Sequence, residues 1–478
     1  MPEMPEMNST DALAHPRRLG LAAALGAYAA AIAVAPKPAG ALLLAAPLAG
    51  LPLCYWAILK PHRWLPLFFA AALLLPPLPF GLGNSGPHPS LVFVGFGLLA
   101  GLWNFNAWRL APAPLNRALL VFLFVLLGST AEAMFYSGLA VGLGSLARVV
   151  LFGISVYVFF YTAHGPGASD PADSFAQARL LYWMAAASAL FACVDFYFQF
   201  PAPAGFGPQF IWLSSGVYRR AQGLFYEAST LGNFCAFFLV MIGAALLAPG
   251  RVSPVSRRAW LPGGIVFAAA LVLSFSRGSL LNLLVAAAAL LYLRRPRVRL
   301  ARIALLFGGI ALAGLLLRAL FPEFAEAYWL RLTASAQYFF SETEGVLSGR
   351  VGSWRAVLAF LAENPWHALL GVGYKTLPYS DYLGRTVITD NMYLSLLAET
   401  GIAGLGAMLW LSLEILRASR RAARSSDSRR SFFGTWIFAF WAGQMVQMFS
   451  GDLLTYWRVM PLYFWVLALA VRDERPVS

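Results

Sequence analysis

Long apolar stretches constrain the fold of this chain more than any other feature of its sequence. Hydrophobic residues make up 60% of the 478 residues and charged residues only 12%, a balance that soluble globular domains rarely approach. About fourteen apolar runs of roughly 16 to 25 residues are each long enough to cross a bilayer as a helix. The sequence therefore predicts an all-α polytopic membrane protein with about 12–14 transmembrane helices.

Basic residues gather in short clusters between the apolar runs, and their positions predict how the helices are oriented. When about fourteen spans are threaded alternately from a cytoplasmic N-terminus, these clusters all fall on the cytoplasmic side. The net charge of +14 is then explained by an anionic cytoplasmic leaflet, so nucleic acid is not expected as a partner. The clusters are Lys60 and Arg63, Arg109 and Arg117, and the basic residues of 251–258, 294–302 and 417–430.

The same threading predicts a single transmembrane domain at residues 17–472. Both ends of the chain are then cytoplasmic, with a disordered segment at 1–16 and a short segment at 473–478. Two substantial segments fall on the periplasmic side, the first at 200–227 and the second at 321–389.

The second periplasmic segment is expected to be a helical loop that lies as a lid against the membrane. Arg350, Trp354 and Leu358 are spaced by four residues and share one helical stripe. This helix cannot continue through Pro365. The helices expected in the segment span 321–340 and 348–363.

Two arginines lie where a membrane protein least tolerates charge. Arg220 is found in YRRAQGLFYEAST, and Arg277 is found in LSFSRGSL, in a tight turn between two apolar runs. A guanidinium near the hydrocarbon is unfavourable unless it faces a cavity or an anionic partner, so each arginine is a functional-site hypothesis. Both fall on the periplasmic side, and the anion that they indicate is a lipid diphosphate. The neighbouring Arg219 is expected at the surface, where its side chain can reach lipid head groups.

Four segments together resemble the bacterial O-antigen ligase and O-antigen polymerase superfamily. They occur in the family's order and at its approximate spacing, and they cover about two-fifths of the chain, roughly residues 215–410. The segments read RRAQGLFYEASTLGNF, LSFSRGSLLNLLV, SGRVGSWRAVLAFLAENPWHALLGVGY and DNMYLSLLAETGIAGL.

The resemblance implies a GT-C-like glycosyltransferase in the bacterial inner membrane. Such an enzyme takes an undecaprenyl-diphosphate-linked glycan as donor on the periplasmic face and uses no metal or other cofactor. In the family, two arginines at the positions of Arg220 and Arg277 are thought to hold the diphosphate. A planar guanidinium suits this task because it can bond two phosphate oxygens while it stays charged. Attack from the face opposite the diphosphate would invert the anomeric centre.

The last segment departs from the family pattern at one position. The family has a histidine, a small amide or hydroxyl residue, nine variable residues and a glycine, whereas this chain has Asp390, Asn391, nine residues and Gly401. The family histidine is the proposed base for the acceptor hydroxyl, so its loss favours a polymerase of O-antigen, capsule or exopolysaccharide repeats over a ligase. Asp390 can act as general base. It can also cap the helix that follows, and the two roles are compatible.

Several other residues are candidates for substrate binding or for ion pairs. Glu227 and Glu399 are expected to pair with an arginine, and Asp195 is a further candidate for such a pair. The substrate-binding candidates are Arg219, Glu227, Arg350, Trp354, Tyr374 and Asn391.

Three functions remain open from the sequence. A polymerase would use another lipid-linked glycan as acceptor and could work with a chain-length regulator. A ligase would transfer the glycan to lipid A core or to a protein. A lipid-linked oligosaccharide flippase is the third, but no repeat relates residues 1–200 to 228–471, as many transporters would require.

Overall fold

The structure is a computed structural model, and it describes most of the chain from residue 50 to residue 472. The expected ends at 1–16 and 473–478, and most of the runs expected at 18–35, 39–59 and 302–320, lie outside the described residues. The structure describes residues 23–24, 26–31, 34, 50–56, 59–78, 87–166, 171–202, 207, 209–213, 216–248, 253–294, 318–319, 322–337 and 350–472.

A bundle of long apolar helices forms the body of the protein, as the apolar runs predicted. Among the described residues, six helices are long and apolar enough to cross a membrane. This confirms the prediction of a mostly helical, polytopic membrane protein. The six are α5 (Pro114–Ser137), α6 (Leu139–His164), α7 (Pro171–Phe198), α8 (Ala228–Leu247), α10 (Arg277–Arg294) and α15 (Met392–Ala423).

Five further α-helices complete the described part of the bundle. They are α3 (Trp64–Leu74), α4 (Ser90–Trp103), α9 (Arg257–Leu273), α16 (Ser428–Gln447) and α17 (Met460–Val471), with 3-10 turns η1 (Phe105–Ala107), η4 (Met448–Ser450) and η5 (Leu453–Thr455). Some neighbouring helices are joined by very short connections; Gly138, with a φ of +86°, alone separates α5 from α6.

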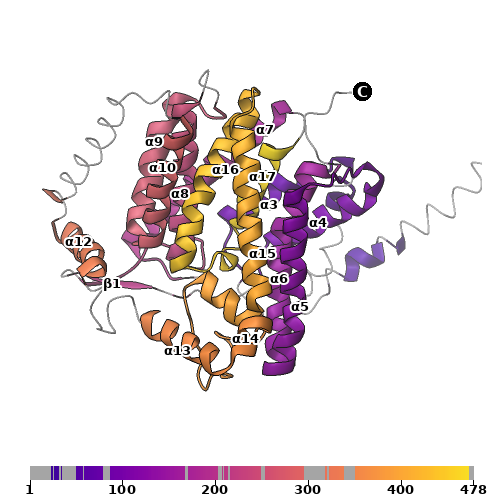
Figure 1. Cartoon of the computed structure of the whole chain (residues 1–478). Coiled ribbons are helices and arrows are strands. Elements are labelled where there is room, and N and C mark those ends of the chain that lie inside the picture. The colour runs from indigo at the N-terminus through magenta and orange to yellow at the C-terminus, as the bar shows by residue number, and fades with distance from the viewer. Residues whose placement is uncertain are drawn as a thin grey trace, which may run out of the picture.

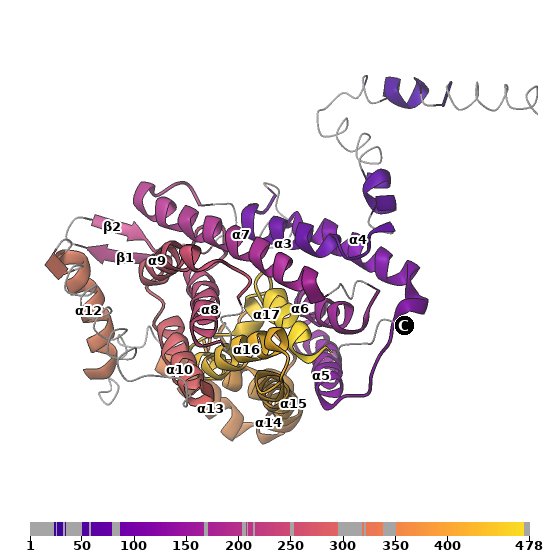
Figure 2. The same ribbon diagram turned by 90° about the horizontal axis from the view of Figure 1, so that it is seen from above.

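Helices α16 and α17 lie at the centre of the bundle. Figure 1 shows α8, α9 and α10 on one side of them and α5 and α6 on the other. Helix α16 packs against α10 and α15, and α17 packs against α6. Viewed from above, α7, α3 and α4 follow one another along one side of the bundle (Figure 2).

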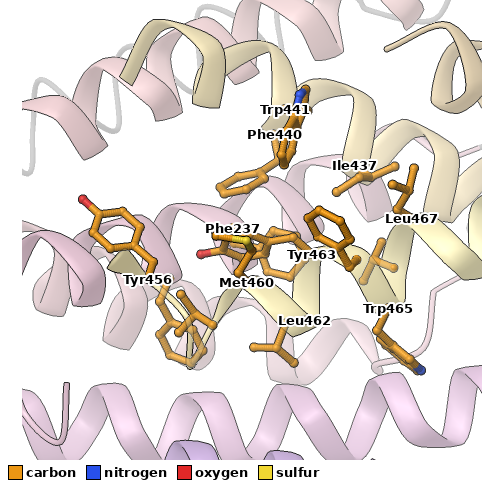
Figure 3. Close-up of a cluster of buried hydrophobic side chains, with 14 of the residues drawn as sticks. Phe237, Ile437, Phe440, Trp441, Tyr456, Met460, Leu462, Tyr463, Trp465 and Leu467 are labelled. Carbon is orange, nitrogen blue, oxygen red and sulfur yellow. The ribbon is translucent and has the colours of Figure 1, made fainter. Parts of the chain in front are cut away.

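Aromatic side chains fill the space around the two central helices. The ring of Phe237 lies 4.6 Å from that of Tyr463 (Figure 3). It lies 4.4 Å from the ring of Trp436, and all three side chains are buried. The indole Nε1 of Trp436 donates to the carbonyl of Phe237 at 2.8 Å, which satisfies a polar group that would otherwise be unpaired in the core. These contacts hold α8, α16 and α17 as one unit.

A small β-hairpin within residues 200–227 was not predicted from the sequence. Strands β1 (Phe210–Leu213) and β2 (Gly216–Arg219) pair antiparallel, with Phe210 opposite Arg219. The hairpin lies at one edge of the molecule next to α12 (Pro322–Gln337) (Figure 2).

The described part of residues 321–389 contains helices, as predicted. It contains α12, α13 (Arg350–Glu363) and α14 (Pro365–Leu370), and Pro365 begins α14 after α13 has ended. The buried face of α13 carries Val357 and Leu361, whereas Leu358, expected on the packed stripe, is 54% exposed. Val357 and Leu361 belong to a second apolar cluster that attaches α13 to α15. The other buried members of this cluster are Val372, Leu377, Val387 and Ala398.

Candidate active site

A polar cavity of about 390 Å³ is lined by the start of α13, by Arg220 next to the hairpin and by the start of α10. Figure 1 shows α13 and the hairpin at the same end of the bundle. Arg220 and Arg277 both line this cavity, although 57 positions separate them. The structure therefore brings together the two arginines that the sequence singled out. The cavity also contains Glu227, Arg350 and Asp390 from the predicted site.

Arg220 is held where the hairpin meets the turn between α9 and α10. Its backbone N–H donates to the carbonyl of Gln209 at 2.7 Å, and its Nη1 donates to Oε1 of the same residue at 2.7 Å. Its Nε donates to the carbonyl of Ser274 at 2.8 Å, and the residue is 9% exposed. Arg220 therefore ties the hairpin to the turn that carries Arg277.

Arg277 is the first residue of α10, in the tight turn predicted from the sequence. Ser276 caps the helix, because the N–H of Ser279 donates to its Oγ at 3.4 Å. Phe275 has a φ of +50°, a backbone conformation that a bulky residue rarely adopts. Arg277 thus enters the cavity at a helix N-terminus, where the helix dipole also favours an anion.

Arg350 and Trp354, one turn apart on α13, hold the segment before α15. Nε of Arg350 donates to Oδ2 of Asp390 at 3.0 Å, and Nε1 of Trp354 donates to the carbonyl of Thr389 at 2.7 Å. Asp390 has a φ of +46°. Arg350 and Asp390 line the cavity, whereas Trp354 does not. The indole holds the backbone of Thr389, next to Asp390, from outside the cavity.

Asn391, not Asp390, caps α15. Its Oδ1 accepts from the N–H of Leu394 at 3.1 Å, which is the contact of an N-cap residue with the third helical position. Asp390 therefore does not cap α15, so the capping alternative left open by the sequence is wrong. Asn391 is also not among the residues that line the cavity, although it was expected to bind substrate.

Glu227 lies at the N-cap position of α8 but does not cap that helix. Its Oε2 accepts from Oγ of Ser229 at 2.9 Å. Among the described residues, Glu227 forms no ion pair with an arginine, although such a pair was expected. Burial raises the pKa of Glu227, and the nearby charges of Asp390 and Asp452 raise it further, against the hydrogen bond from Ser229 and the charge of Lys375. A buried carboxyl with a raised pKa is suited to proton transfer.

Besides Trp354 and Asn391, two more predicted substrate-binding residues, Arg219 and Tyr374, do not line the cavity. Nη2 of Arg219 forms an ion pair with Oδ1 of Asp195 at 2.6 Å, and Arg219 is 8% exposed, so it does not lie at the lipid interface as expected. The expected partner of Asp195 is confirmed. Tyr374 is buried in the main core, where its N–H donates to Oγ of Ser129 at 2.7 Å.

The structure adds cavity residues that sequence reasoning missed. Lys375, with a φ of +60°, forms an ion pair with Asp452. Burial opposes its charge, but Asp452 and other nearby acidic groups raise the pKa of Lys375 overall. The guanidinium of Arg148 lies 3.8 Å from the ring centroid of Tyr379. Only Arg148 had a sequence signal, since it interrupts an apolar run.

Glu399 lines the cavity but does not pair with an arginine as expected. Its Oε1 accepts from the N–H of Leu377 at 3.2 Å. Among the described residues, the cavity lining contains five basic and four acidic residues. The basic residues are Arg148, Arg220, Arg277, Arg350 and Lys375, and the acidic residues are Glu227, Asp390, Glu399 and Asp452.

Two of the acidic residues are engaged by basic neighbours. Asp390 pairs with Arg350, and Asp452 pairs with Lys375. Arg148, Arg220 and Arg277 also line the cavity, and guanidinium groups are well suited to bind the oxygens of an anionic ligand. Within the described ranges, no group of three or more His, Cys, Asp or Glu residues is placed to hold a metal ion.

Comparison with known proteins identifies part of the chain. Residues 262–409 match the O-antigen ligase family, Wzy_C, so the predicted resemblance is confirmed over this region. The matched region contains Arg277, Arg350 and Asp390, whereas Arg220 and Glu227 precede it. No protein of curated function matches the chain.

Proposed function

Because residues 262–409 form an O-antigen ligase domain, we propose that the chain is a glycosyltransferase of the periplasmic membrane face. It takes an undecaprenyl-diphosphate-linked glycan as donor and polymerises repeat units of O-antigen, capsule or exopolysaccharide. The observation that supports this proposal most is the single cavity shared by Arg220 and Arg277.

The arginines stabilise the charge that develops when the donor bond breaks. The bond between the anomeric carbon and the diphosphate oxygen breaks, and its electron pair leaves with undecaprenyl diphosphate. Arg277 can bond two phosphate oxygens at the N-terminus of α10. Arg220 uses Nε and Nη1 to hold the two sides of the site, so it fixes the position of its charge. This arrangement supplies the leaving group with its stabilisation from side chains alone.

A carboxylate in the same cavity takes the proton of the acceptor. The acceptor oxygen forms the new bond to the anomeric carbon, and its proton passes to Asp390. Arg350 orients that carboxylate through Oδ2. Attack from the face opposite the diphosphate inverts the anomeric centre. Glu227 is a second carboxyl of the cavity that can move a proton, and its raised pKa suits this role.

The replacement of the family histidine by Asp390 favours a polymerase over a ligase. In the polymerase the acceptor is the terminal sugar of another lipid-linked glycan, and a chain-length regulator is a possible partner. In the ligase it is a lipid A core sugar or a protein hydroxyl. The remaining alternative is a lipid-linked oligosaccharide flippase, which would form no glycosidic bond.

The distribution of charge supports a cavity that faces the periplasm of the bacterial inner membrane. Helix α15 begins beside Asp390 and ends with Arg420 and Arg421, and α16 begins with Arg429 and Arg430. The basic clusters therefore lie at the end of these helices opposite the cavity, as the positive-inside rule requires for a periplasmic site and cytoplasmic termini.

Reconstitution with a purified undecaprenyl-diphosphate-linked repeat unit tests the proposal. A ladder of longer lipid-linked chains is expected for the polymerase. Transfer only to added lipid A core would identify a ligase. Movement of the substrate across the membrane without a new glycosidic bond would identify a flippase and refute both enzymes.

A further inference from the structure

Four amide side chains meet in the apolar interior of the bundle. They are Asn233 of α8, Asn282 of α10, and Gln444 and Gln447 of α16, and each is at most 2% exposed. Nδ2 of Asn233 donates to Oε1 of both glutamines, and Nδ2 of Asn282 donates to the same two oxygens. The hydroxyl of Tyr463, on α17, donates to Oδ1 of Asn233. This amide cluster therefore joins four helices by hydrogen bonds across the bundle.

The two glutamines share both asparagine partners but differ in one contact. Oε1 of each glutamine accepts two hydrogen bonds, so both side chains hold α8 and α10 against α16. Nε2 of Gln447 donates in addition to Oγ of Ser279 at 3.2 Å. Gln447 is also among the described residues that line the candidate active-site cavity, and Gln444 is not. Of the two glutamines, Gln447 therefore connects the amide cluster to the cavity wall.

Ser279, the third partner of Gln447, belongs to the first turn of α10. It lies two residues after Arg277 and is fully buried. Its Oγ lies 2.8 Å from Oγ of Ser276, the residue that caps this helix, and donates to the carbonyl of Ser229 at 3.4 Å. Gln447 therefore contacts the turn whose conformation sets where Arg277 enters the cavity.

The backbone next to Arg277 also packs directly on Gln447. Gly278 has no side chain, and a Cβ atom at this position would lie 3.4 Å from Cγ of Gln447 and 2.5 Å from Oγ of Ser450. Gly278 and Ser450 both line the cavity. A change in the Gln447 side chain therefore alters the packing of the backbone that carries Arg277, because contacts this close leave no free space between the segments.

We propose that Gln447 is a positioning residue that fixes the first turn of α10, so that the guanidinium of Arg277 meets the diphosphate of the donor. This inference rests on the proposed function, in which Arg277 binds that diphosphate. A side chain that is already held in its binding position loses less conformational freedom when the ligand arrives. Gln447 supplies this order from the amide cluster and acts through Arg277, so it need not touch the substrate itself.

Two variants of the same chemistry separate positioning from stability. Gln447→Met and Gln444→Met each remove one amide and leave each asparagine with one acceptor fewer, so both should lower the melting temperature by similar amounts. Affinity for undecaprenyl diphosphate is measured on the purified full-length protein in neutral detergent by native mass spectrometry. We expect a loss on the order of tenfold for Gln447→Met and of less than about twofold for the control, Gln444→Met. Single-turnover rates per folded molecule should follow the same order.

A double variant tests whether Gln447 acts through Arg277. In the Arg277→Lys background, Gln447→Met should weaken binding of undecaprenyl diphosphate by less than about twofold, because the contact that Gln447 positions is already weakened. If Gln447→Met does not fold, Ser279→Ala removes the acceptor of its Nε2 and leaves the hydrogen bonds among the four amides in place. The same loss, on the order of tenfold, is expected for Ser279→Ala.

Equal affinities of Gln447→Met and Gln444→Met for undecaprenyl diphosphate would refute this inference. An undiminished effect of Gln447→Met in the Arg277→Lys background would refute it too, because Gln447 would then act independently of Arg277. In both cases the proposed function stands as long as Arg277→Lys alone weakens binding. Wild-type affinity in Arg277→Lys would instead overturn the diphosphate contact of the proposed function, and this inference with it.

Discussion

Nε of Arg350 lies 3.0 Å from Oδ2 of Asp390, and this ion pair joins residues 40 positions apart that both line the candidate active-site cavity. Arg350 begins α13, and Asp390 comes just before the cap of α15. The pair therefore links the candidate base to helix α13. Both side chains are partly exposed, at 24% and 45%, so the pair contributes more to geometry than to stability.

Arg350→Gln should reduce the rate of glycan transfer on the order of tenfold, because the Asp390 carboxylate loses the contact that orients it. The free energy of unfolding should fall by no more than about 1 kcal/mol, as for other partly exposed ion pairs. Initial rates on the lipid-linked repeat unit and thermal unfolding measure the two effects. Arg355→Gln, on an exposed position of α13, is the control and should retain its rate. Equal rates for the two variants would show that Arg350 does not contribute to the reaction.

Asp390→Asn should lower the rate by about 10²-fold to 10⁴-fold, because an amide cannot accept the proton of the acceptor. Stability should change little, since Asn391 supplies the cap of α15. The complementary variant, Asn391→Ala, should lose about 1 kcal/mol of stability and keep most of its rate per folded molecule. Rates and melting temperatures of both variants separate the two roles. A normal polymer ladder from Asp390→Asn would show that another group takes the proton.

Much of the architecture could be predicted because the thickness of a bilayer fixes the length of an apolar helix. The turn that contains Arg277 was also predictable, because a charge between two apolar runs is unfavourable without a function. The hairpin was missed, because each of its strands has only four residues and its position depends on contacts such as that of Arg220 with Gln209. Short strands of this kind carry little local signal.

Other parts of the site depend on contacts between distant segments. Lys375 and Asp452 are 77 positions apart, and neither residue has a neighbour in the sequence that indicates the ion pair. The cap of α15 is Asn391, one residue after Asp390, for which the sequence left the capping role open; helix ends are commonly misplaced by one or two residues. Arg219 and Arg220 are adjacent in sequence, but only the structure shows that Arg219 faces Asp195 while Arg220 lines the cavity.

Arg277→Lys should fold normally and lose about 100-fold in rate, or about 3 kcal/mol of transition-state stabilisation, because an ammonium cannot replace a bidentate guanidinium. The polymer ladder under single-turnover conditions measures the chemical step directly. Wild-type activity in this variant would contradict a diphosphate contact.

Arg219→Gln should have the opposite pattern. This change leaves the buried Asp195 carboxylate without its cation, so the free energy of unfolding should fall by about 3 to 5 kcal/mol. The rate per folded molecule should change much less than in Arg277→Lys. Chemical denaturation and a rate normalised to folded protein give the two values. A stable Arg219→Gln protein with a large loss of rate would instead place Arg219 in the substrate site.

Glu227→Gln should change the pH dependence of the reaction. Burial raises the pKa of Glu227, so the protonated form persists above the usual range of a glutamate, about pH 4.3. If ionised Glu227 takes part in proton transfer, the rate should rise with pH through this raised pKa, and Glu227→Gln should lose that limb. The stability of the folded protein should change with pH in the direction opposite to the rate. Between the unfolded and the raised folded pKa the folded protein binds more protons than the unfolded chain, so wild-type stability should fall as pH rises. Glu227→Gln should lack this fall. An unchanged acid limb in the variant would show that Glu227 is not the group whose ionisation controls the rate.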